Sequence, residues 1–153
     1  MKKRVNDFFD FYRKHDVDGM VSLCTENARF NYVPFEAWGE QRVVRGTGHV
    51  RGIGKATWAT FIDSFPDLSN KVHFVDSDEN GNAVAEVVIG GRQKKPFGTI
   101  GNLGKEYKLP HVFVFKFDEN EKIDMINGYW DGTDLFKQLG RNEIDWLIWN
   151  DKI

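Results

Sequence analysis

The chain has little cysteine, almost no net charge and no long apolar run, and each shortage excludes a class of protein. Cys24 is the single cysteine in 153 residues, so an internal disulfide is excluded and a reducing compartment is expected. A net charge of −2 gives no electrostatic basis for binding nucleic acid or an anionic membrane surface. No stretch approaches the roughly 20 apolar residues of a membrane span. Acidic residues interrupt the basic start of the chain, so no signal-peptide core forms and a cytoplasmic location is expected.

Aromatic residues are what the chain has in excess. Thirteen phenylalanines and five tryptophans contribute to a composition that is 14% aromatic and 41% hydrophobic. This composition is typical of a folded chain, and the length fits one domain with a sizeable core. The rings predict a wide apolar interior or a cavity lined with aromatic side chains.

Four helices are predicted from apolar spacing and from residues that start or end helices. Apolar positions in the first and third repeat at intervals of three and four, and Pro66 ends the third. Asp16 or Asp18 is the expected N-cap of the second, and Gly140 follows the end of the fourth. The predicted helices cover residues 2–15, 16–24, 53–65 and 133–140.

Strands are predicted between and after these helices. A first strand over residues 28–33 is expected to stop at Pro34, and the glycine-rich residues 35–52 fit either a loop or a short strand. Two hairpins follow, one turning at Asn80-Gly81 and one at residues 118–121. Helices followed by a mostly antiparallel set of strands predict an α+β fold.

The last twelve or so residues differ from the rest of the chain. Residues 142–153 carry two tryptophans among isoleucine and leucine and leave little polar face. We expect a single domain over residues 1–141 and a C-terminal extension that packs on this domain or on a partner subunit.

Four stretches of the chain share a pattern with one known superfamily. They are DVDGMVSLCTENARFNYVP (16–34), FIDSFPDL (61–68), GTIGNLGKEY (98–107) and FDENEKIDMINGYWD (117–131). In the last of them Ile123 is followed eight residues later by Asp131. Together they resemble the SnoaL-like polyketide cyclase branch of the nuclear-transport-factor-2-like superfamily, which also contains the ketosteroid isomerases.

The resemblance implies a fold and a site. The implied fold is a cone in which a curved, mostly antiparallel sheet packs on about three helices of the N-terminal half and encloses an apolar pocket. Polyketide cyclases of this branch use an aspartate at the place of Asp131 as general acid/base, without metal or cofactor. His111 is then the expected catalytic partner that orients the aspartate or relays its proton. The resemblance also implies a homodimer formed through the outer sheet face.

Strand alternation predicts which side chains face the implied pocket. On the last strand Asn127, Tyr129 and Asp131 share one face, and on the strand before it His111 and Phe113 do. The expected substrate contacts are Tyr32, Trp38, Trp58, Gln93, Phe113, Asn127 and Tyr129. For each of the aromatic residues, ordinary core packing is the competing interpretation.

Asp131 has three interpretations from the sequence alone. It ends a strand-like run, so it is a solvated strand end, the N-cap of the helix that follows, or an acid held at a pocket. A site walled by rings would raise the pKa of such an acid and bring it towards working pH. No pair of histidines or acids has a metal-ligand spacing such as H-x-x-x-H, so no metal is expected.

Several positions depart from the patterns of the superfamily. Phe8 stands where ketosteroid isomerases carry a tyrosine, and Tyr32-Val33 precede Pro34 where those enzymes carry an aspartate. Limonene epoxide hydrolases carry an Arg-x-Asp motif on a central strand, and the matching strand of this chain, AVAEVVI, has Glu86 as its single charged residue.

Within the cyclase branch, Gln93 replaces a common histidine, and Met125 and Asn127 replace the usual glutamate and tryptophan. The pocket chemistry is therefore altered relative to all three groups.

Two functions fit these observations. The first is a cofactor-free enzyme of the lyase or isomerase class, which cyclises or isomerises a hydrophobic, carbonyl-bearing small molecule through Asp131 and His111. The second is a non-catalytic module of the same fold that binds a small ligand or mainly dimerises.

Overall fold

The structure is a computed structural model that describes residues 1–39, 42–98 and 100–140, without the side chains of residues 33–46. In chain order its elements are α1 (Lys2–Arg13), α2 (Val17–Ser22), β1 (Cys24–Gly39), β2 (Arg42–His49), the π-helical turn η1 (Val50–Gly54), α3 (Lys55–Ser64), β3 (Ser69–Ser77), β4 (Asn82–Arg92), β5 (Glu106–Phe117), β6 (Ile123–Trp130) and α4 (Gly132–Gln138). The predicted C-terminal extension, residues 142–153, lies outside the described residues.

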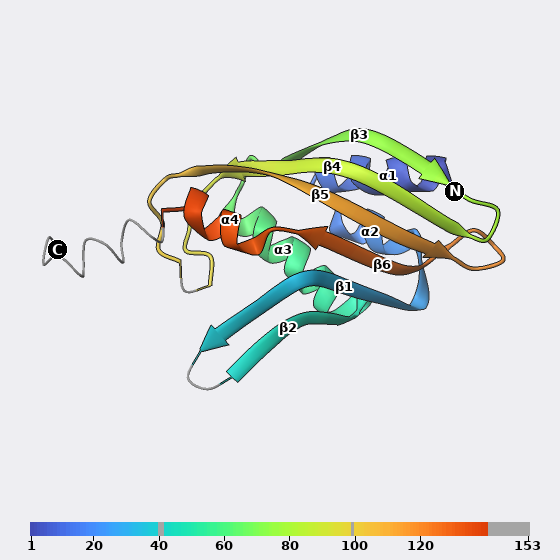
Figure 1. Ribbon diagram of the computed structural model, residues 1–153, viewed down its shortest axis with the longest axis horizontal. Helices are drawn as coiled ribbons and strands as arrows, with labels where there is room; N and C mark the ends of the chain where they lie inside the picture. The colour runs from blue at the N-terminus through green and yellow to red at the C-terminus, as the bar shows by residue number, and fades with distance from the viewer. Residues whose placement is uncertain (40–41, 99, 141–153) are drawn as a thin grey trace, which may run out of the picture.

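The six strands form one curved sheet in the order β2-β1-β6-β5-β4-β3. Only the β1–β6 pair is parallel, so the sheet that these strands form is mixed but mostly antiparallel. It is open, with β2 and β3 as its edges, and α1, α2 and α3 cover one face (Figure 1). The α+β architecture expected from the sequence is confirmed. In the described ranges no helix is long and apolar enough to cross a membrane.

The helices begin and end close to the predicted residues because their signals are local. In α1 the buried residues are Val5, Phe8, Phe9 and Tyr12, as the spacing predicted. The side chain of Asp16 caps α2 by accepting a hydrogen bond from Gly19 N at 2.8 Å. The third helix is preceded by the π-helical turn η1, and Gly140 follows α4 with a φ of +87°.

Aromatic rings fill the space between the helices and the sheet. Phe8 on α1 contacts Trp58 on α3 at 5.4 Å and Phe115 on β5 at 5.5 Å, both edge to face. Phe9 contacts Phe113 on β5 in the same way at 5.2 Å. Such pairs contribute about 0.5–1.5 kcal/mol each beyond the area that they bury. The wide aromatic interior predicted from composition is therefore present as a packed core.

The first strand is longer than predicted. β1 continues past Pro34 to Gly39 and pairs with β2 on one side and β6 on the other. The β1–β2 register shifts between Asn31 and Glu36, and Pro34 falls inside this irregularity. A proline is tolerated where the ladder of hydrogen bonds between two strands is interrupted, because no backbone N–H donor is needed at that position. The expectation that Pro34 ends the strand was wrong for this reason.

The face assigned to the last strand was also wrong. A bulge at the start of β6 pairs Ile123 with Phe117 and Met125 with Lys116, which leaves Asp124 without a partner on β5. One extra residue reverses the alternation of everything that follows. The buried residues of β6 are consequently Ile123, Ile126, Gly128 and Trp130, whereas Met125, Asn127 and Tyr129 lie on the outer face.

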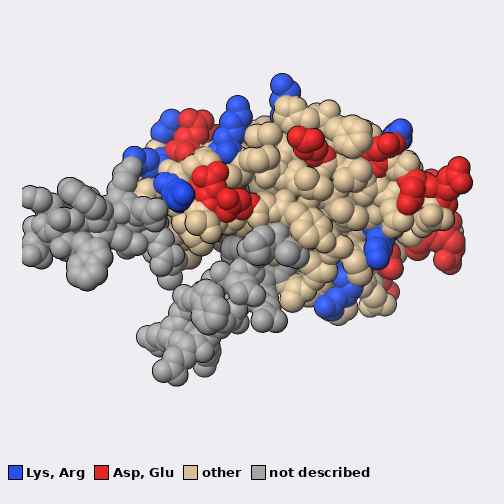
Figure 2. Space-filling view, viewed as in Figure 1, with Lys and Arg blue, Asp and Glu red and all other residues tan. Residues whose placement is uncertain are grey.

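Both predicted hairpins are present, and each is closed by an aspartate. Asp78 Oδ1 accepts hydrogen bonds from the backbone N–H groups of Asn80 and Asn82, and Asp118 Oδ1 accepts the equivalent bonds from Asn120 and Lys122. The two turns lie at the end of the molecule that carries the N-terminus, where acidic side chains gather (Figures 1 and 2).

Candidate functional site

A buried histidine and a buried tyrosine form the polar centre of the interior. Nε2 of His111 on β5 lies 2.6 Å from the hydroxyl oxygen of Tyr32 on β1. Both side chains are buried, with exposed fractions of 2% for His111 and 8% for Tyr32. The strand alternation on β5 had predicted that His111 and Phe113 face inwards, and this is confirmed.

The two residues meet although β6 lies between their strands. In the sheet, Gly128 of β6 pairs with Tyr32 on one side and with Phe113 on the other. A Cβ atom at position 128 would lie 2.9 Å from Cδ1 of Tyr32 and 3.0 Å from Cε1 of Phe113. Because glycine leaves this space open, the Tyr32 ring crosses β6 and reaches the imidazole.

The second ring nitrogen of His111 fixes the tautomer. Nδ1 lies 3.1 Å from the carbonyl oxygen of Leu109, which only accepts hydrogen bonds. Nδ1 therefore carries the hydrogen, and Nε2 of the neutral ring accepts a hydrogen bond from the Tyr32 hydroxyl. Burial lowers the pKa of His111 from 6.5 to about 4, which keeps the ring neutral at pH 7. Burial also raises the pKa of Tyr32 well above its ordinary value.

Aromatic rings stack on both sides of this pair. The His111 ring is nearly parallel to those of Trp130 and Phe113, with interplanar angles of 6° and centroid distances of 5.4 and 5.6 Å. Trp130 also stacks on Tyr32, with a centroid distance of 4.7 Å. The polar atoms are thus enclosed by four flat side chains, which we call the ring cluster: Tyr32, His111, Phe113 and Trp130.

Helix α3 and the loop after β4 close the ring cluster on another side. Phe61 on α3 contacts both Tyr32 and Trp130, with ring centroids 6.1 and 6.3 Å away. The ring of Phe97 contacts that of Phe61 in a tilted arrangement, with centroids 4.6 Å apart, and only 7% of Phe97 is exposed. The loop that carries Phe97 is tied to the end of α3, because Ser64 donates a hydrogen bond to the carbonyl oxygen of Pro96.

Gln93 lies beneath this loop and is completely buried. Its Nε2 donates to the carbonyl oxygens of Lys95 at 3.1 Å and Ile100 at 3.3 Å. Its Oε1 has no hydrogen-bond partner in the described part of the chain. Gln93 therefore holds the loop in place and leaves one buried acceptor unused. Its expected contact with a substrate stays a prediction.

Asp131 occupies a different position from the one expected. Its side chain is exposed and accepts a hydrogen bond from Asp134 N at 3.1 Å, so it is the N-cap of α4. Of the three interpretations drawn from the sequence, the geometry matches the helix cap. The structure describes no contact between this carboxylate and His111, and the expected pairing of the two was wrong. The bulge in β6 is the cause, because it turns the side chain of Trp130 towards the interior and leaves Tyr129 and Asp131 exposed.

Asn127 and Tyr129 follow the same reversal. Asn127 Oδ1 accepts a hydrogen bond from Asn31 Nδ2 at 2.8 Å, and Thr47 on β2 donates to Asn31 Oδ1, so these groups form a polar row across the outer face. Tyr129 is 47% exposed on that face. Neither side chain reaches the interior, and their predicted role as inward-facing contacts was wrong.

The three remaining residues that were predicted to contact a substrate are Phe113, Trp58 and Trp38. Phe113 belongs to the ring cluster, whereas Trp58 is a core residue that packs against Phe8 and Phe30. Trp38 pairs with Val43 through its backbone in β1 and β2, and its side chain lies outside the described part.

Trp130 is the main residue that the sequence did not identify. Alternation from Asn127 through Tyr129 to Asp131 was taken to face inwards, whereas the buried residues are Ile126, Gly128 and Trp130. The apolar residues Ile123 and Ile126 are three positions apart instead of two, and this spacing was the signal of a bulge in the sequence.

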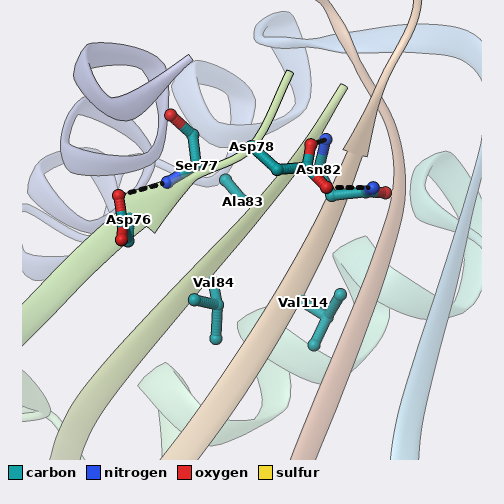
Figure 3. A pocket seen from close by; sticks show the side chains of 7 residues that line it. All are labelled: Asp76, Ser77, Asp78, Asn82, Ala83, Val84 and Val114. Atoms are coloured by element: carbon teal, nitrogen blue, oxygen red, sulfur yellow. Dashed lines mark hydrogen bonds between the residues drawn. The ribbon is translucent and has the colours of Figure 1, made fainter. Parts of the chain in front are cut away.

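The described residues form two hollows on the outer face of the sheet. A small one of about 250 Å³ has Val84 and Val114 at its floor and Asp76 and Asp78 at its rim (Figure 3). Asp78 is occupied by the turn, since it also binds the side chain of Asn82, and Asp76 pairs with Lys2 at 3.3 Å. A larger groove lies across β3, β4 and β5.

Comparisons with known proteins agree with this architecture. Residues 5–125 match the SnoaL-like domain family. AclR from Streptomyces galilaeus has a TM-score of 0.73 at 14% sequence identity, and the match covers 92% of this chain and 95% of AclR.

Two further structures are also similar. SalBIII, an epoxide hydrolase/cyclase-like enzyme of pyran ring formation in polyether salinomycin, has a TM-score of 0.65 at 18% identity, over 87% of this chain and 92% of SalBIII. A protein with a ketosteroid isomerase-like fold from Catenulispora acidiphila DSM 44928 has a TM-score of 0.69 at 12% identity, over 90% of this chain and 92% of its own.

A comparison with curated protein sequences found no match. At identities this low the structural neighbours establish the fold alone, while the family match spans most of the domain that surrounds the ring cluster. The chain belongs to the SnoaL-like domain family.

Proposed function

We propose that this protein is a cofactor-free enzyme that carries out general acid/base chemistry on a hydrophobic, carbonyl-bearing small molecule. The observation that carries the proposal is the buried hydrogen bond between Tyr32 and His111 inside the ring cluster. The match to the SnoaL-like domain family and the structural likeness to SalBIII, an epoxide hydrolase/cyclase-like enzyme, support an enzyme of this general type. Cyclisation and isomerisation are the two reactions that this chemistry serves.

The two residues have complementary roles in the proposed reaction. Neutral His111 accepts the α-proton of the substrate at Nε2 after the Tyr32 hydroxyl turns towards the substrate carbonyl. The hydroxyl then donates a hydrogen bond to the enolate oxygen that develops. The low pKa of His111 makes it a weak base in the empty site, but the negative charge of the enolate stabilises the imidazolium beside it. Return of the proton from His111 to a second carbon completes an isomerisation. In a ring closure the enolate attacks a second carbonyl, and the oxygen of that carbonyl takes the proton back from the His111 imidazolium.

Deuterium exchange tests the proton transfer without a known substrate. The protein is incubated in D₂O with 2-tetralone and 1-indanone, and incorporation at the α-carbon is followed by NMR. We expect exchange faster than in buffer, and a loss of about 100-fold in His111→Gln and Tyr32→Phe, since general acid/base catalysis contributes on this scale.

Glu119→Gln is the matched control, because Glu119 is exposed in the turn between β5 and β6. It removes a carboxylate without touching the ring cluster and is expected to keep the full rate. Exchange no faster than in buffer, or equal rates in wild type and in both site variants, would refute the proposed chemistry.

The second candidate function is a dimerising or ligand-binding module without catalysis. A cross-strand row of outer-face residues, Tyr129, Val112, Glu86 and Phe74, leaves three large apolar side chains 42–49% exposed. Exposed apolar patches of this kind are typical of interaction surfaces. We propose that a second copy of the chain covers this row. The cytoplasmic location expected from the sequence stays a prediction.

A further inference from the structure

The larger groove on the outer face shares no residue with the ring cluster. It has a volume of about 650 Å³ and lies over β4, with β3 on one side and β5 on the other. Volumes between about 300 and 1,000 Å³ are typical of small-molecule sites. The groove is therefore large enough to hold a ligand of its own.

A glycine explains why the sheet is hollow here. Gly90 takes an outward position of β4, between the buried residues Ile89 and Gly91. A Cβ at this position would lie only 2.3 Å from the carbonyl oxygen of Tyr107 on β5. Because this close approach of the two strands excludes a side chain, the centre of the groove has a flat backbone floor. Val88 and Pro110, which pair with each other across β4 and β5, extend the floor with apolar surface.

Two lysines rise on opposite sides of this floor. Lys71 on β3 pairs with Val88, and Lys108 on β5 pairs with Gly90, so the two basic side chains flank the apolar strip. Within the described ranges the ammonium group of neither lysine has a hydrogen bond or an ion pair, and both residues are exposed. His73 also lines the groove from β3.

The two acids of the groove already have partners. Glu106 forms an ion pair with the Arg92 guanidinium at 3.4 Å, and the Asp67 carboxylate accepts a hydrogen bond from the Arg92 backbone N–H at 2.7 Å. Arg92 also donates to the carbonyl oxygen of Gly104 at 2.7 Å, which fixes its position at the rim. The groove and its rim thus carry three basic side chains (Lys71, Lys108 and Arg92) against the two carboxylates, an excess of one positive charge.

We propose that this groove binds a small amphipathic anion. The apolar body of the ligand lies on Val88, Gly90 and Pro110, and its carboxylate, sulfonate or phosphate group lies between Lys71 and Lys108. A neutral ligand would leave both ammonium groups without a partner, and a cation would be repelled by them. The site is independent of the proposed catalytic chemistry in the interior.

Fluorescence titration with 8-anilinonaphthalene-1-sulfonate tests the proposal. This probe has an aromatic body and one sulfonate, and N-phenyl-1-naphthylamine serves as its uncharged counterpart. The double variant Lys71→Gln/Lys108→Gln is expected to raise the Kd of the sulfonate about tenfold, because two solvent-exposed charge interactions are lost. The Kd of the uncharged probe is expected to stay the same.

The matched control is Lys116→Gln/Lys122→Gln, which removes the same charge outside the groove. It is expected to keep the Kd of the sulfonate within twofold of wild type. Amide shift changes in wild-type NMR spectra are expected at Val88 and Lys108 and not at the Trp130 indole.

Four results would overturn the proposal. They are no binding of the sulfonate to wild type, equal Kd values in wild type and the groove variant, shift changes confined to the interior, and a change in sedimentation mass of the groove variant. The last result would assign the groove to a second copy of the chain.

Discussion

The hydroxyl oxygen of Tyr32 and Nε2 of His111 lie 2.6 Å apart inside the ring cluster, and the Leu109 carbonyl fixes the direction of their hydrogen bond. The tyrosine donates and the neutral imidazole accepts. Both groups are shielded from water, so the stability of the fold and its proposed chemistry depend on the same proton.

The pH dependence of stability is expected to report on His111. Its pKa is lowered from 6.5 to about 4 in the folded state, so between these values the unfolded chain binds a proton that the folded chain does not. The free energy of unfolding therefore falls as the pH decreases from 6.5 towards 4 and is insensitive to this group above 6.5. The decrease from His111 is about 3 kcal/mol at most.

Urea unfolding of wild type and His111→Gln at pH 7 and pH 4.5 measures this difference. The variant is expected to lose less stability on acidification than wild type, since glutamine does not titrate. Equal losses in the two proteins would show that the imidazole is protonated in the folded state without cost.

Tyr32→Phe is expected to destabilise the fold by about 1–3 kcal/mol, because Nε2 of His111 then stays buried without a donor. Tyr32→Phe/His111→Phe is expected to cost less than the sum of the two single variants, since no polar atom of the pair remains unsatisfied. Chemical unfolding at pH 7 completes this double-mutant cycle. Strict additivity would argue against the hydrogen bond.

Gly128→Ala is expected to disturb the pair through packing alone. The added Cβ would lie 2.9 Å from the Tyr32 ring, and overpacking of this kind costs about 1–3 kcal/mol. Gly52→Ala is the control, because a Cβ there meets no atom within 4 Å. Thermal unfolding and the deuterium-exchange assay are both informative. A Gly128→Ala protein with wild-type stability and exchange rate would show that the Tyr32 ring does not need this space.

Asp131 offers a direct contrast between capping and catalysis. Asp131→Ala is expected to lose about 0.5–2 kcal/mol through the missing N-cap of α4, while Asp131→Asn keeps the cap. Both variants are expected to retain the deuterium-exchange rate. A stable Asp131→Asn protein that has lost exchange would instead support the catalytic role first assigned to this residue from the sequence.

The outer face is expected to determine the oligomeric state. Tyr129→Lys/Val112→Lys places two charges in the proposed dimer surface and is expected to shift sedimentation velocity towards the monomer. Leu103→Lys is the control, since Leu103 is similarly exposed (46%) but lies in the loop before β5. A wild-type monomer at high concentration, or equal dimerisation in all three proteins, contradicts the proposed surface.

Local signals in the sequence determined most of the secondary structure. The apolar spacing of Phe8 and Phe9, the Asp16 cap and the turn at Gly81 each act within a few residues, so the elements that they define were predictable. The inward face of His111 and Phe113 was predictable for the same reason, because β5 keeps its alternation through these positions.

The arrangement of the site depended on tertiary structure. One unpaired residue, Asp124, reverses the alternation of β6, so that Trp130 and not Asp131 faces the interior. Counting alternate residues along a single strand does not detect such a bulge. Tyr32 and His111 are 79 residues apart in the chain and meet only because Gly128 on the strand between them has no side chain. The sequence by itself determined that a histidine would be buried among rings. Its partner was decided by the pairing of three strands, because only that pairing brings β1, β6 and β5 side by side.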